Sequence, residues 1–246
     1  MRNINYYEKE YIKEDFEQYQ VMYRRKNILE ILKQYDTSSV LEIGCGMSPL
    51  FKYLKYGEDF GSYTIVEPGE RFYSNAKNMA GDNKHIKIYK GFIEELAGNI
   101  SSNFSFIICS SLLHEVANPE LLLKSIAILC NKDTVIHINV PNAESFHRIL
   151  AKEIGLIENV YCLSDRNKLL QQNNIYNMEL LNDIVKQAGF LVISQGSYFI
   201  KPFTHKQMFS MIKQEIINED ILDGLYEMSK YMPGYGSEIY VNCKLL

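Results

Sequence analysis

Two glycines that follow a short apolar run, with an acid just before them, are the residues of this sequence best suited to hold a cofactor. The stretch VLEIGCGMSP, residues 40–49, places Gly44 and Gly46 after such a run, with Glu42 just before them. Glycine lets the backbone approach a ligand closely, and a helix that follows such a turn offers N–H groups to it. The pattern therefore predicts a strand–turn–helix unit that binds a nucleotide-like cofactor.

The details of this turn argue against a dinucleotide. A dinucleotide site has the pattern GxGxxG, and the position of the third glycine is occupied here by Pro49. A carboxylate at Glu42 would also repel a pyrophosphate, whereas it suits a cationic ligand. The turn therefore favours a cationic cofactor.

The chain resembles the class I S-adenosylmethionine (SAM) methyltransferases from about residue 25 to the C-terminus. Their first motif, E/D-x-G-x-G, is matched by residues 42–46. The resemblance implies that Glu67, which ends the next strand in YTIVEPGE, accepts hydrogen bonds from the ribose hydroxyls, as an acid does in dinucleotide folds. In KGFIEEL the family usually has an acid after the glycine. This chain has Phe92 and Ile93 there, so the adenine contact is expected from backbone groups or from Glu94.

The segment SSLLHEVANPE resembles the part of the family that ends the fourth strand and begins the next helix. By this resemblance, Ser110 and Leu112 border the methionine part of SAM. The cofactor contacts that the resemblance implies are Glu42, Gly44, Cys45, Gly46, Glu67, Phe92, Ile93, Ser110 and Leu112. The expected product is S-adenosylhomocysteine (SAH).

His114 is the first candidate for a catalytic base. Methyl transfer is an in-line displacement at an activated sulfonium, so positioning supplies much of the rate, and a hydroxyl acceptor also benefits from a base. His114 follows the fourth predicted strand, and Glu115 could orient its ring. The pair resembles that of plant-type phenol and small-molecule O-methyltransferases, where the histidine is the base. In many other class I enzymes this position is not catalytic, and a histidine that caps or packs on the next helix is the alternative.

His147 is the second catalytic candidate. It follows the fifth predicted strand in NVPNAESFHRI, where Asn142 and Ser145 either border the acceptor or cap a helix. The remaining histidines, 85, 137 and 205, are expected to be structural or exposed, and no spacing among them predicts a metal site.

The spacing of apolar residues predicts the elements that position these groups. Strands are expected at 40–43, 62–66, 85–89, 104–109, 134–140, 190–195 and 237–245, with helices at 14–35, 50–54, 71–79, 119–130 and 178–188. Strands that alternate with helices indicate an α/β fold with a doubly wound, mostly parallel seven-stranded sheet, which the resemblance identifies as Rossmann-like.

Three segments fall outside this alternation. Residues 1–35 are expected to form an N-terminal helical lid, whose tyrosines 6, 7, 11, 19 and 23 either close over the pocket or simply pack. Residues 36–246 then form the SAM-binding domain. Within it, the segments at about 143–177 and 203–233 are expected to be cap insertions that cover the site.

Composition narrows the class of partner. The net charge of −4 disfavours general nucleic-acid binding, and the basic run Arg24-Arg25-Lys26 is expected to be a solvated face.

The five cysteines include no CxxC pair, which disfavours zinc and disulfides and indicates a cytoplasmic location. The polar N-terminal stretch does not read as a signal peptide, and no apolar run is long enough to span a membrane.

The sequence thus predicts a SAM-dependent methyltransferase that acts on an oxygen of a small polar biosynthetic intermediate. Segments such as VPNAESFHRILAKEIGLI and QAGFLVISQGSYFIKPF resemble a bacterial subgroup acting on small molecules, among them cell-surface glycan precursors. The expected partner is a small-molecule acceptor, without nucleic acid or membrane, and a homodimer is left open.

Three alternatives remain. A SAM-binding regulatory or partner protein without catalysis is the first. An NAD-dependent reductase is the second, but its Tyr-x-x-x-Lys pair occurs only at Tyr73/Lys77 and Tyr226/Lys230, too early and too late in the chain. Methylation of nucleic acid is the third, and it lacks both the Asp/Asn-Pro-Pro-aromatic motif and a Pro-Cys nucleophile.

Overall fold

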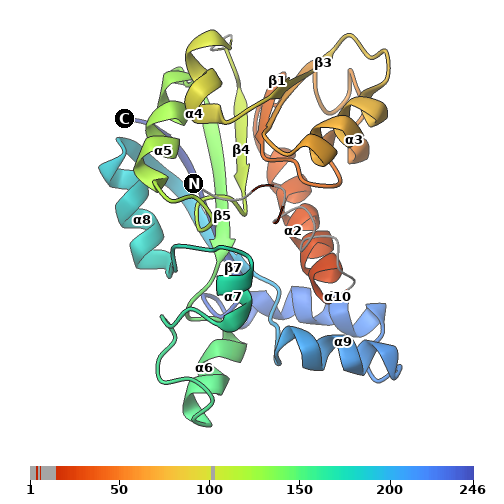
Figure 1. Cartoon of the computed structure of the whole chain (residues 1–246), viewed down its shortest axis with the longest axis vertical. Helices are drawn as coiled ribbons and strands as arrows, with labels where there is room; N and C mark the ends of the chain where they lie inside the picture. The colour runs from red at the N-terminus through yellow and green to blue at the C-terminus, as the bar shows by residue number, and fades with distance from the viewer. Residues whose placement is uncertain (1–3, 5, 7–14, 101–102) are drawn as a thin grey trace.

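A seven-stranded sheet in the order β3-β2-β1-β4-β5-β7-β6 forms the centre of the computed structural model, which describes residues 4, 6, 15–100 and 103–246 (Figure 1). The strands are β1 (Ser39–Ile43), β2 (Ser62–Glu67), β3 (Ile86–Lys90), β4 (Phe106–Ser110), β5 (Val135–Pro141), β6 (Phe190–Tyr198) and β7 (Glu238–Leu245). β1 to β5 pair in parallel, and β7 runs antiparallel between β5 and β6. The predicted doubly wound α/β fold is therefore confirmed.

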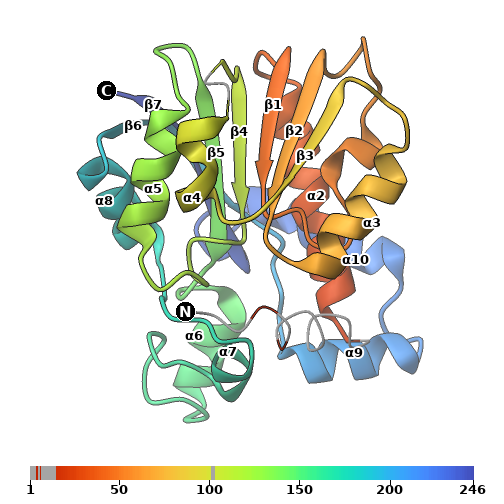
Figure 2. The same cartoon turned by 45° about the horizontal axis from the view of Figure 1, so that its top comes forward.

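Helices cover both faces of this sheet (Figure 2). They are α2 (Glu17–Leu32), η1 (Leu50–Tyr53), α3 (Glu70–Ala80), α4 (Ile93–Leu96), η2 (Ala97–Asn99), α5 (Pro119–Ile128), α6 (Phe146–Glu153), α7 (Asp165–Leu169), α8 (Met178–Gln187), α9 (His205–Lys213), α10 (Glu219–Glu227) and η3 (Met228–Lys230). Local signals set their ends: Asn118 caps α5 ahead of Pro119, and Gly189 follows α8 with φ of +89°.

Two apolar clusters fix the helices on the sheet. Ile28 of α2 and Ala76 of α3 share one cluster with β1, β2 and β4. Ile93 of α4, Leu122 of α5 and Leu181 of α8 share the other with the strands. β1, β2, β4 and β5 are buried between these layers, and their apolar runs are nearly continuous, as the sequence indicates. β3, at the edge of the sheet, alternates instead and has no fully buried residue.

The two segments expected to be insertions contain helices and lie beyond the carboxyl ends of the parallel strands (Figures 1 and 2). We call them together the cap. Helices α6 and α7 lie between β5 and α8, and α9, α10 and η3 lie between β6 and β7. The second part packs against α2, where Tyr23 stacks on Phe199 with ring centroids 4.6 Å apart.

This packing distinguishes between the two roles, lid or packing, that the sequence left open for the N-terminal tyrosines. Tyr23 is 1% exposed and Tyr19 packs against the same cluster, so both are packing residues. Tyr6 is exposed, and Tyr7 and Tyr11 lie outside the described residues. Within the described residues, no helix combines the length and apolar character needed to cross a bilayer.

Arg24 corrects one prediction from the sequence. It was expected on a solvated face, yet its side chain is 9% exposed and its guanidinium donates to both carboxylate oxygens of Glu238, with the Nη2–Oε1 distance 2.5 Å. Glu17 accepts a further bond from Nη2 at 3.2 Å. The prediction was wrong because Glu238 is distant from Arg24 in sequence, and the fold buries the two side chains together. The ion pair joins α2 to β7.

We expect loss of one member of this pair to destabilise the fold strongly. Arg24→Met leaves the Glu238 carboxylate buried without its cation, which should lower the free energy of unfolding by about 3–5 kcal/mol in urea denaturation. Lys26→Met is the matched control, because Lys26 and Asp223 form an exposed pair worth about 1 kcal/mol or less. The double variant Arg24→Met/Glu238→Leu should lose less than Arg24→Met alone. A double variant that is the less stable of the two would contradict this account.

A buried histidine in β5 gives the fold a predictable response to acid. Burial lowers the pKa of His137 from 6.5 to about 4, although Nδ1 pairs with Asn242 Oδ1 at 2.8 Å. Between these two values the unfolded chain binds the proton and the folded chain does not. His137 therefore costs no stability above pH 6.5, and destabilises the fold progressively as the pH falls towards 4.

The measurement compares wild type with His137→Leu by urea denaturation across this range. Because other groups titrate equally in both proteins, the difference in their free energies of unfolding isolates His137. It should move in favour of the variant by about 3 kcal/mol as the pH falls from 6.5 to 4. A difference that stays constant with pH would show that His137 does not resist protonation.

Candidate functional site

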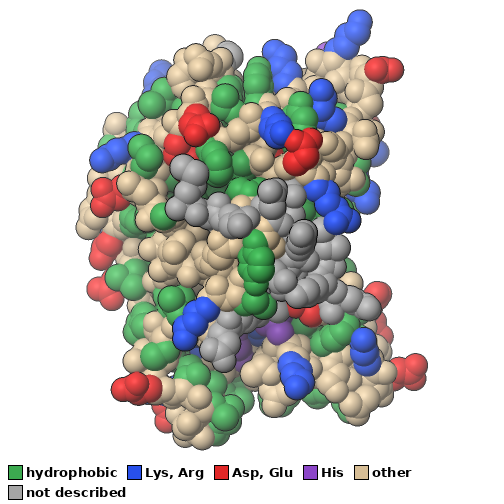
Figure 3. All heavy atoms as spheres, in the orientation of Figure 1, with side chains coloured by type: hydrophobic (Ala, Val, Ile, Leu, Met, Phe, Trp, Pro, Cys, Tyr) green, Lys and Arg blue, Asp and Glu red, His purple; other side chains and the backbone are tan. Residues whose placement is uncertain are grey.

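A cavity of about 770 Å³ lies beyond the carboxyl ends of the parallel strands. Its walls come from the turn after β1, the ends of β2 and β4, helix α2 and the cap. Open α/β sheets bind ligands at this edge. Histidine side chains are visible in the hollow between the two parts of the cap (Figure 3).

The turn after β1 has the backbone that glycine permits. Gly44 has φ of +74° and Gly46 has φ of +57°, and the Gly44 N–H donates to Val66 O at 2.9 Å. Two side chains hold the following residues from outside. Arg25 Nη2 donates to Ser48 O at 2.8 Å, and Asn75 Nδ2 donates to Met47 O at 2.6 Å.

Glu42 holds this turn from inside. Its buried carboxylate borders the cavity and accepts hydrogen bonds from Leu50 N at 3.1 Å and from Tyr63 Oη at 2.9 Å. Burial raises the pKa of Glu42 to about 7, against the effect of these bonds. The expected helix of residues 50–54 is only the short η1, and Glu42 takes its first N–H. A large part of what Glu42 does is therefore structural, which the sequence analysis does not anticipate.

Glu67 connects the ends of three segments. Its Oε1 accepts from Gly69 N at 2.8 Å, its Oε2 accepts from Gly46 N at 3.3 Å, and its backbone carbonyl accepts from Gly91 N at 3.2 Å. Burial raises the pKa of this carboxyl. Oε2 also accepts the Cys45 thiol at 3.7 Å, whereas Oε1 can accept a second hydrogen bond, and the residue borders the cavity. Glu67 can therefore hold the turn and accept a ligand hydroxyl at the same time.

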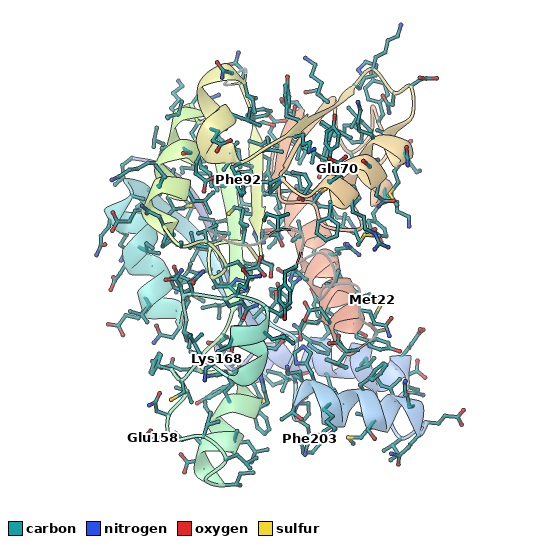
Figure 4. The ribbon with its side chains drawn as sticks, in the orientation of Figure 1. Met22, Glu70, Phe92, Glu158, Lys168 and Phe203 are labelled. Atoms are coloured by element: carbon teal, nitrogen blue, oxygen red, sulfur yellow. The ribbon has the colours of Figure 1, made fainter. Side chains whose placement is uncertain are left out.

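Phe92 and its neighbours lie at the same part of the cavity. Phe92 precedes α4 and is half-buried, and Figure 4 shows it well separated from Lys168 and Phe203 of the cap. Ile93 is buried in the core, as is Cys45, although both border the cavity. Burial raises the pKa of the Cys45 thiol, so this group is an unreactive thiol.

The end of β4 contributes Ser110 and Leu112 to the cavity wall. Between them, Ser111 has φ of +54°, a conformation that a residue with a Cβ rarely adopts. Its N–H donates to Asn139 Oδ1 at 2.7 Å, and Asn139 Nδ2 donates to Tyr198 Oη at 2.6 Å. This buried contact to β5 and β6 holds the strained turn in place.

His114 follows this turn and borders the cavity, with 3% of its surface exposed. Its carbonyl accepts from the N–H groups of Asn173 and Asn174, at 3.0 and 3.1 Å, which fastens a cap loop to the end of β4. The imidazole Nε2 lies 3.8 Å from Glu115 Oε1, within ion-pair range but longer than a hydrogen bond. The structure thus brings the predicted pair together at the cavity.

His147, the second predicted candidate, also borders the cavity, from α6. Its Nδ1 lies 3.1 Å from the Oγ of Ser145, which is fully buried. Burial lowers the pKa of His147 well below its ordinary value, and the charges of Lys201 and Arg148 and the nearby His205 lower it further. Asn142 has a structural role instead, because its Nδ2 donates to two backbone carbonyls in the loop before β7.

The sequence did not indicate that several further residues border the cavity. Gln20 and Arg24 of α2, Lys201 after β6, and His205 at the start of α9 all border the cavity. His205 was expected to be structural or exposed. Its contacts fit a structural role, with Nδ1 2.9 Å from Lys201 Nζ and Nε2 3.3 Å from Glu17 Oε2, but the sequence did not indicate that it borders the cavity. No motif marks these residues, since only tertiary packing brings their segments together.

The other two histidines behave as expected. His85 is exposed and stacks on Tyr56, with ring centroids 3.8 Å apart, and His137 is buried in β5. Among the residues that the structure describes, no group of three or more His, Cys, Asp and Glu side chains is arranged to hold a metal ion.

Comparison with known sequences places the chain in a family. A model described as a methyltransferase domain matches residues 4–195. A segment of 122 residues is 27% identical to the hybrid PKS-NRPS synthetase poxE of Penicillium oxalicum. This segment is 47% of the chain but only 3% of that synthetase.

Solved structures show the same fold at low identity. A SAM-dependent methyltransferase from Thermotoga maritima is 18% identical, with a TM-score of 0.59 over 93% of each chain. The plantazolicin methyltransferase BamL, solved with a desmethyl substrate analogue and SAH, is 16% identical, with a TM-score of 0.58 over 93% of this chain and 90% of its own. The [4+2]-cyclase SpnF is 12% identical, with a TM-score of 0.59 over 89% of this chain and 80% of its own.

The fold alone does not fix the chemistry, since a cyclase shares it, but the family model extends over most of the chain and includes the glycine turn, Glu67 and the end of β4. The chain therefore belongs to the methyltransferase-domain family, and it has the fold of solved SAM-dependent methyltransferases.

Proposed function

We propose that this enzyme transfers the methyl group of SAM to an oxygen of a small, polar biosynthetic intermediate. The observation that carries the proposal is one continuous cavity of about 770 Å³. The glycine turn and Glu67 border one part of it, and His114 and polar cap residues border the rest. Its volume lies in the range of small-molecule sites, about 300–1,000 Å³. The polar side chains on the cap side suit a hydroxylated acceptor, such as a precursor of a cell-surface glycan.

The residues around the glycine turn fit SAM. Gly44 and Gly46 leave the backbone open to a close approach, and Glu67 Oε1, which accepts only from Gly69 N, has a lone pair left for a ribose hydroxyl. Phe92, Ile93 and Glu94 border the cavity where the adenine would lie, and Ser110 and Leu112 would border the methionine part. Glu42 and Cys45 would support the turn from below. SAM supplies a methyl group already activated on a sulfonium.

His114 is the proposed base. As the acceptor oxygen forms its bond to the methyl carbon and the bond from carbon to sulfur breaks, the hydroxyl proton passes to the His114 imidazole. Glu115, 3.8 Å from Nε2, would then stabilise the imidazolium. His147 is the weaker candidate, because the surrounding positive charges reduce its basicity. A SAM-binding protein without catalysis would share the cofactor contacts but would not need His114.

The glycine turn can be tested with two matched substitutions. Gly44→Val and Gly57→Val both force a branched residue to a positive φ, of +74° and +81°, but only Gly44 borders the cavity. Both variants should lose similar stability, about 1–3 kcal/mol. Calorimetric titration should show SAH affinity reduced at least about 100-fold in Gly44→Val, since the side chain enters the cofactor site, and unchanged in Gly57→Val. Equal SAH affinity in the two variants would sink the assignment of the turn.

The role of His114 is tested by turnover. His114→Ala should lower kcat by about 10²–10⁴ and leave SAH affinity unchanged, because a base acts only on the acceptor proton. The assay uses radiolabelled SAM and whichever acceptor the wild type methylates in a screen of hydroxylated metabolites. His147→Ala, in the same cavity, should cost less than about tenfold. A loss below tenfold in His114→Ala would move His114 to a structural role.

A further inference from the structure

The cap side of the cavity carries positive charge that methyl transfer itself does not use. We define the cap-side subsite as Gln20, His147, Arg148 and Lys201. They come from α2, from α6 and from the segment after β6, and all four border the cavity. These residues meet only in the folded protein. Because they border the cap side of the cavity rather than the part formed by the glycine turn, we expect them to contact the acceptor rather than the cofactor.

Arg148 is the first cation of this subsite. Its Nε and Nη2 donate to Val160 O at 3.0 and 2.6 Å, and Nη2 donates to Cys162 O at 2.7 Å. These acceptors are neutral carbonyls. Among the side chains that the structure describes, which exclude those of residues 165 and 166, no aspartate or glutamate forms an ion pair with this half-buried guanidinium. An anion in the cavity would balance its charge, because a partly desolvated cation favours a counter-ion.

Lys201 is the second cation, and it is only 2% exposed. Its Nζ lies 2.9 Å from His205 Nδ1, and an ammonium can only donate, so Nδ1 must be the accepting nitrogen. The proton of His205 then lies on Nε2, which faces Glu17 Oε2 at 3.3 Å. Buried lysines are rare and occur where their charge has a purpose. This arrangement fixes an ammonium group at the cavity wall.

His147 lies at the point where these charges act together. The charges of Lys201 and Arg148, and His205 beside them, all lower its pKa, in addition to the effect of burial. His147 is therefore neutral at pH 7. The two cations near this point, Lys201 and Arg148, disfavour a positive charge here and would favour a negative one.

Gln20 provides an independent sign that a ligand binds here. Its side chain is 4% exposed, and its Nε2 donates to Ser237 Oγ at 2.7 Å. Its Oε1 is buried with no hydrogen-bond partner among the described residues. An unsatisfied buried amide oxygen costs about 1–3 kcal/mol, so it indicates a missing partner. A hydroxyl of the acceptor would supply that partner.

We infer that the acceptor is an organic acid, whose carboxylate binds between Lys201 and Arg148 while a hydroxyl donates to Gln20. This inference rests on the proposed methyl transfer, and it names the substrate class. A carboxylate suits the subsite better than a phosphate dianion does. Asp15 and Glu17 border the same cavity, and Arg24 is already ion-paired with Glu17 and Glu238. The negative charges of these acids would disfavour a second negative charge on the ligand. Arg148 Nη1, which is not used by the carbonyls of Val160 and Cys162, is the donor left for a carboxylate oxygen.

The test measures binding of acids and of their neutral isosteres to protein saturated with SAH. The probes are formate, acetate, benzoate and 4-hydroxybenzoate, each compared with its amide, together with inorganic phosphate, by calorimetry at constant ionic strength. At least one acid should bind at least about tenfold more tightly than its amide and more tightly than phosphate. The inference is overturned if no acid binds at millimolar concentrations, if the amides bind equally well, or if phosphate binds best.

Substitutions then assign the binding to the subsite. Lys201→Met should weaken binding of the preferred acid at least about tenfold, because the ammonium is lost. Lys206→Met is the control, since Lys206 is exposed on α9 and does not border the cavity. Arg148→Met is the second variant and should weaken acid binding in the same way. Equal acid affinity in wild type and in both subsite variants would overturn the inference.

SAH affinity is measured separately in every protein, which keeps two failures apart. Unchanged SAH affinity in Lys201→Met shows that the variant is folded and that the loss concerns the acid alone. Failure of the wild type to bind SAH would instead overturn the proposed function, and this inference with it.

Discussion

Two buried carboxylates hold the turn on which the cofactor site depends. Glu42 accepts the first N–H of η1 and the Tyr63 hydroxyl, and Glu67 accepts the N–H groups of Gly46 and Gly69. The turn has positive φ at both glycines and is too irregular to be held by strand or helix hydrogen bonds. Without these carboxylates the backbone N–H groups would be buried unpaired, which proteins avoid. These two acids thus build the turn as well as bordering the cavity.

A second set of buried polar contacts links the turn after β4 to helix α2 across the cavity wall. Ser111, in a strained turn, is held by Asn139, and Asn139 donates to Tyr198. Tyr198 in turn donates to Glu238, which pairs with Arg24 of α2. Since each group has a partner on the next element, the two sides of the cavity are fixed relative to one another. Such a network preorganises the two parts of the site for an in-line transfer.

How far the sequence predicts this structure depends on the range of the interactions. Strands such as Val40–Ile43 and the glycine turn were predicted because apolar period, glycine positions and strand-end acids are local signals. Arg24, Lys201 and His205 were missed or misjudged, because their partners are distant in sequence or are assembled by the cap. Tyr23 was left open between lid and packing for the same reason. A residue whose role depends on tertiary neighbours has no local signature.

The central claim is that one cavity holds SAM at the glycine turn and an acceptor on the cap side. A crystal structure of the protein with SAH tests it most directly. The account predicts that the SAH ribose lies against Glu67, that its amino-acid part lies between the glycine turn and Ser110, and that its sulfur faces the side of His114. SAH bound elsewhere, or with its sulfur turned away from His114 and the cap, would contradict the account.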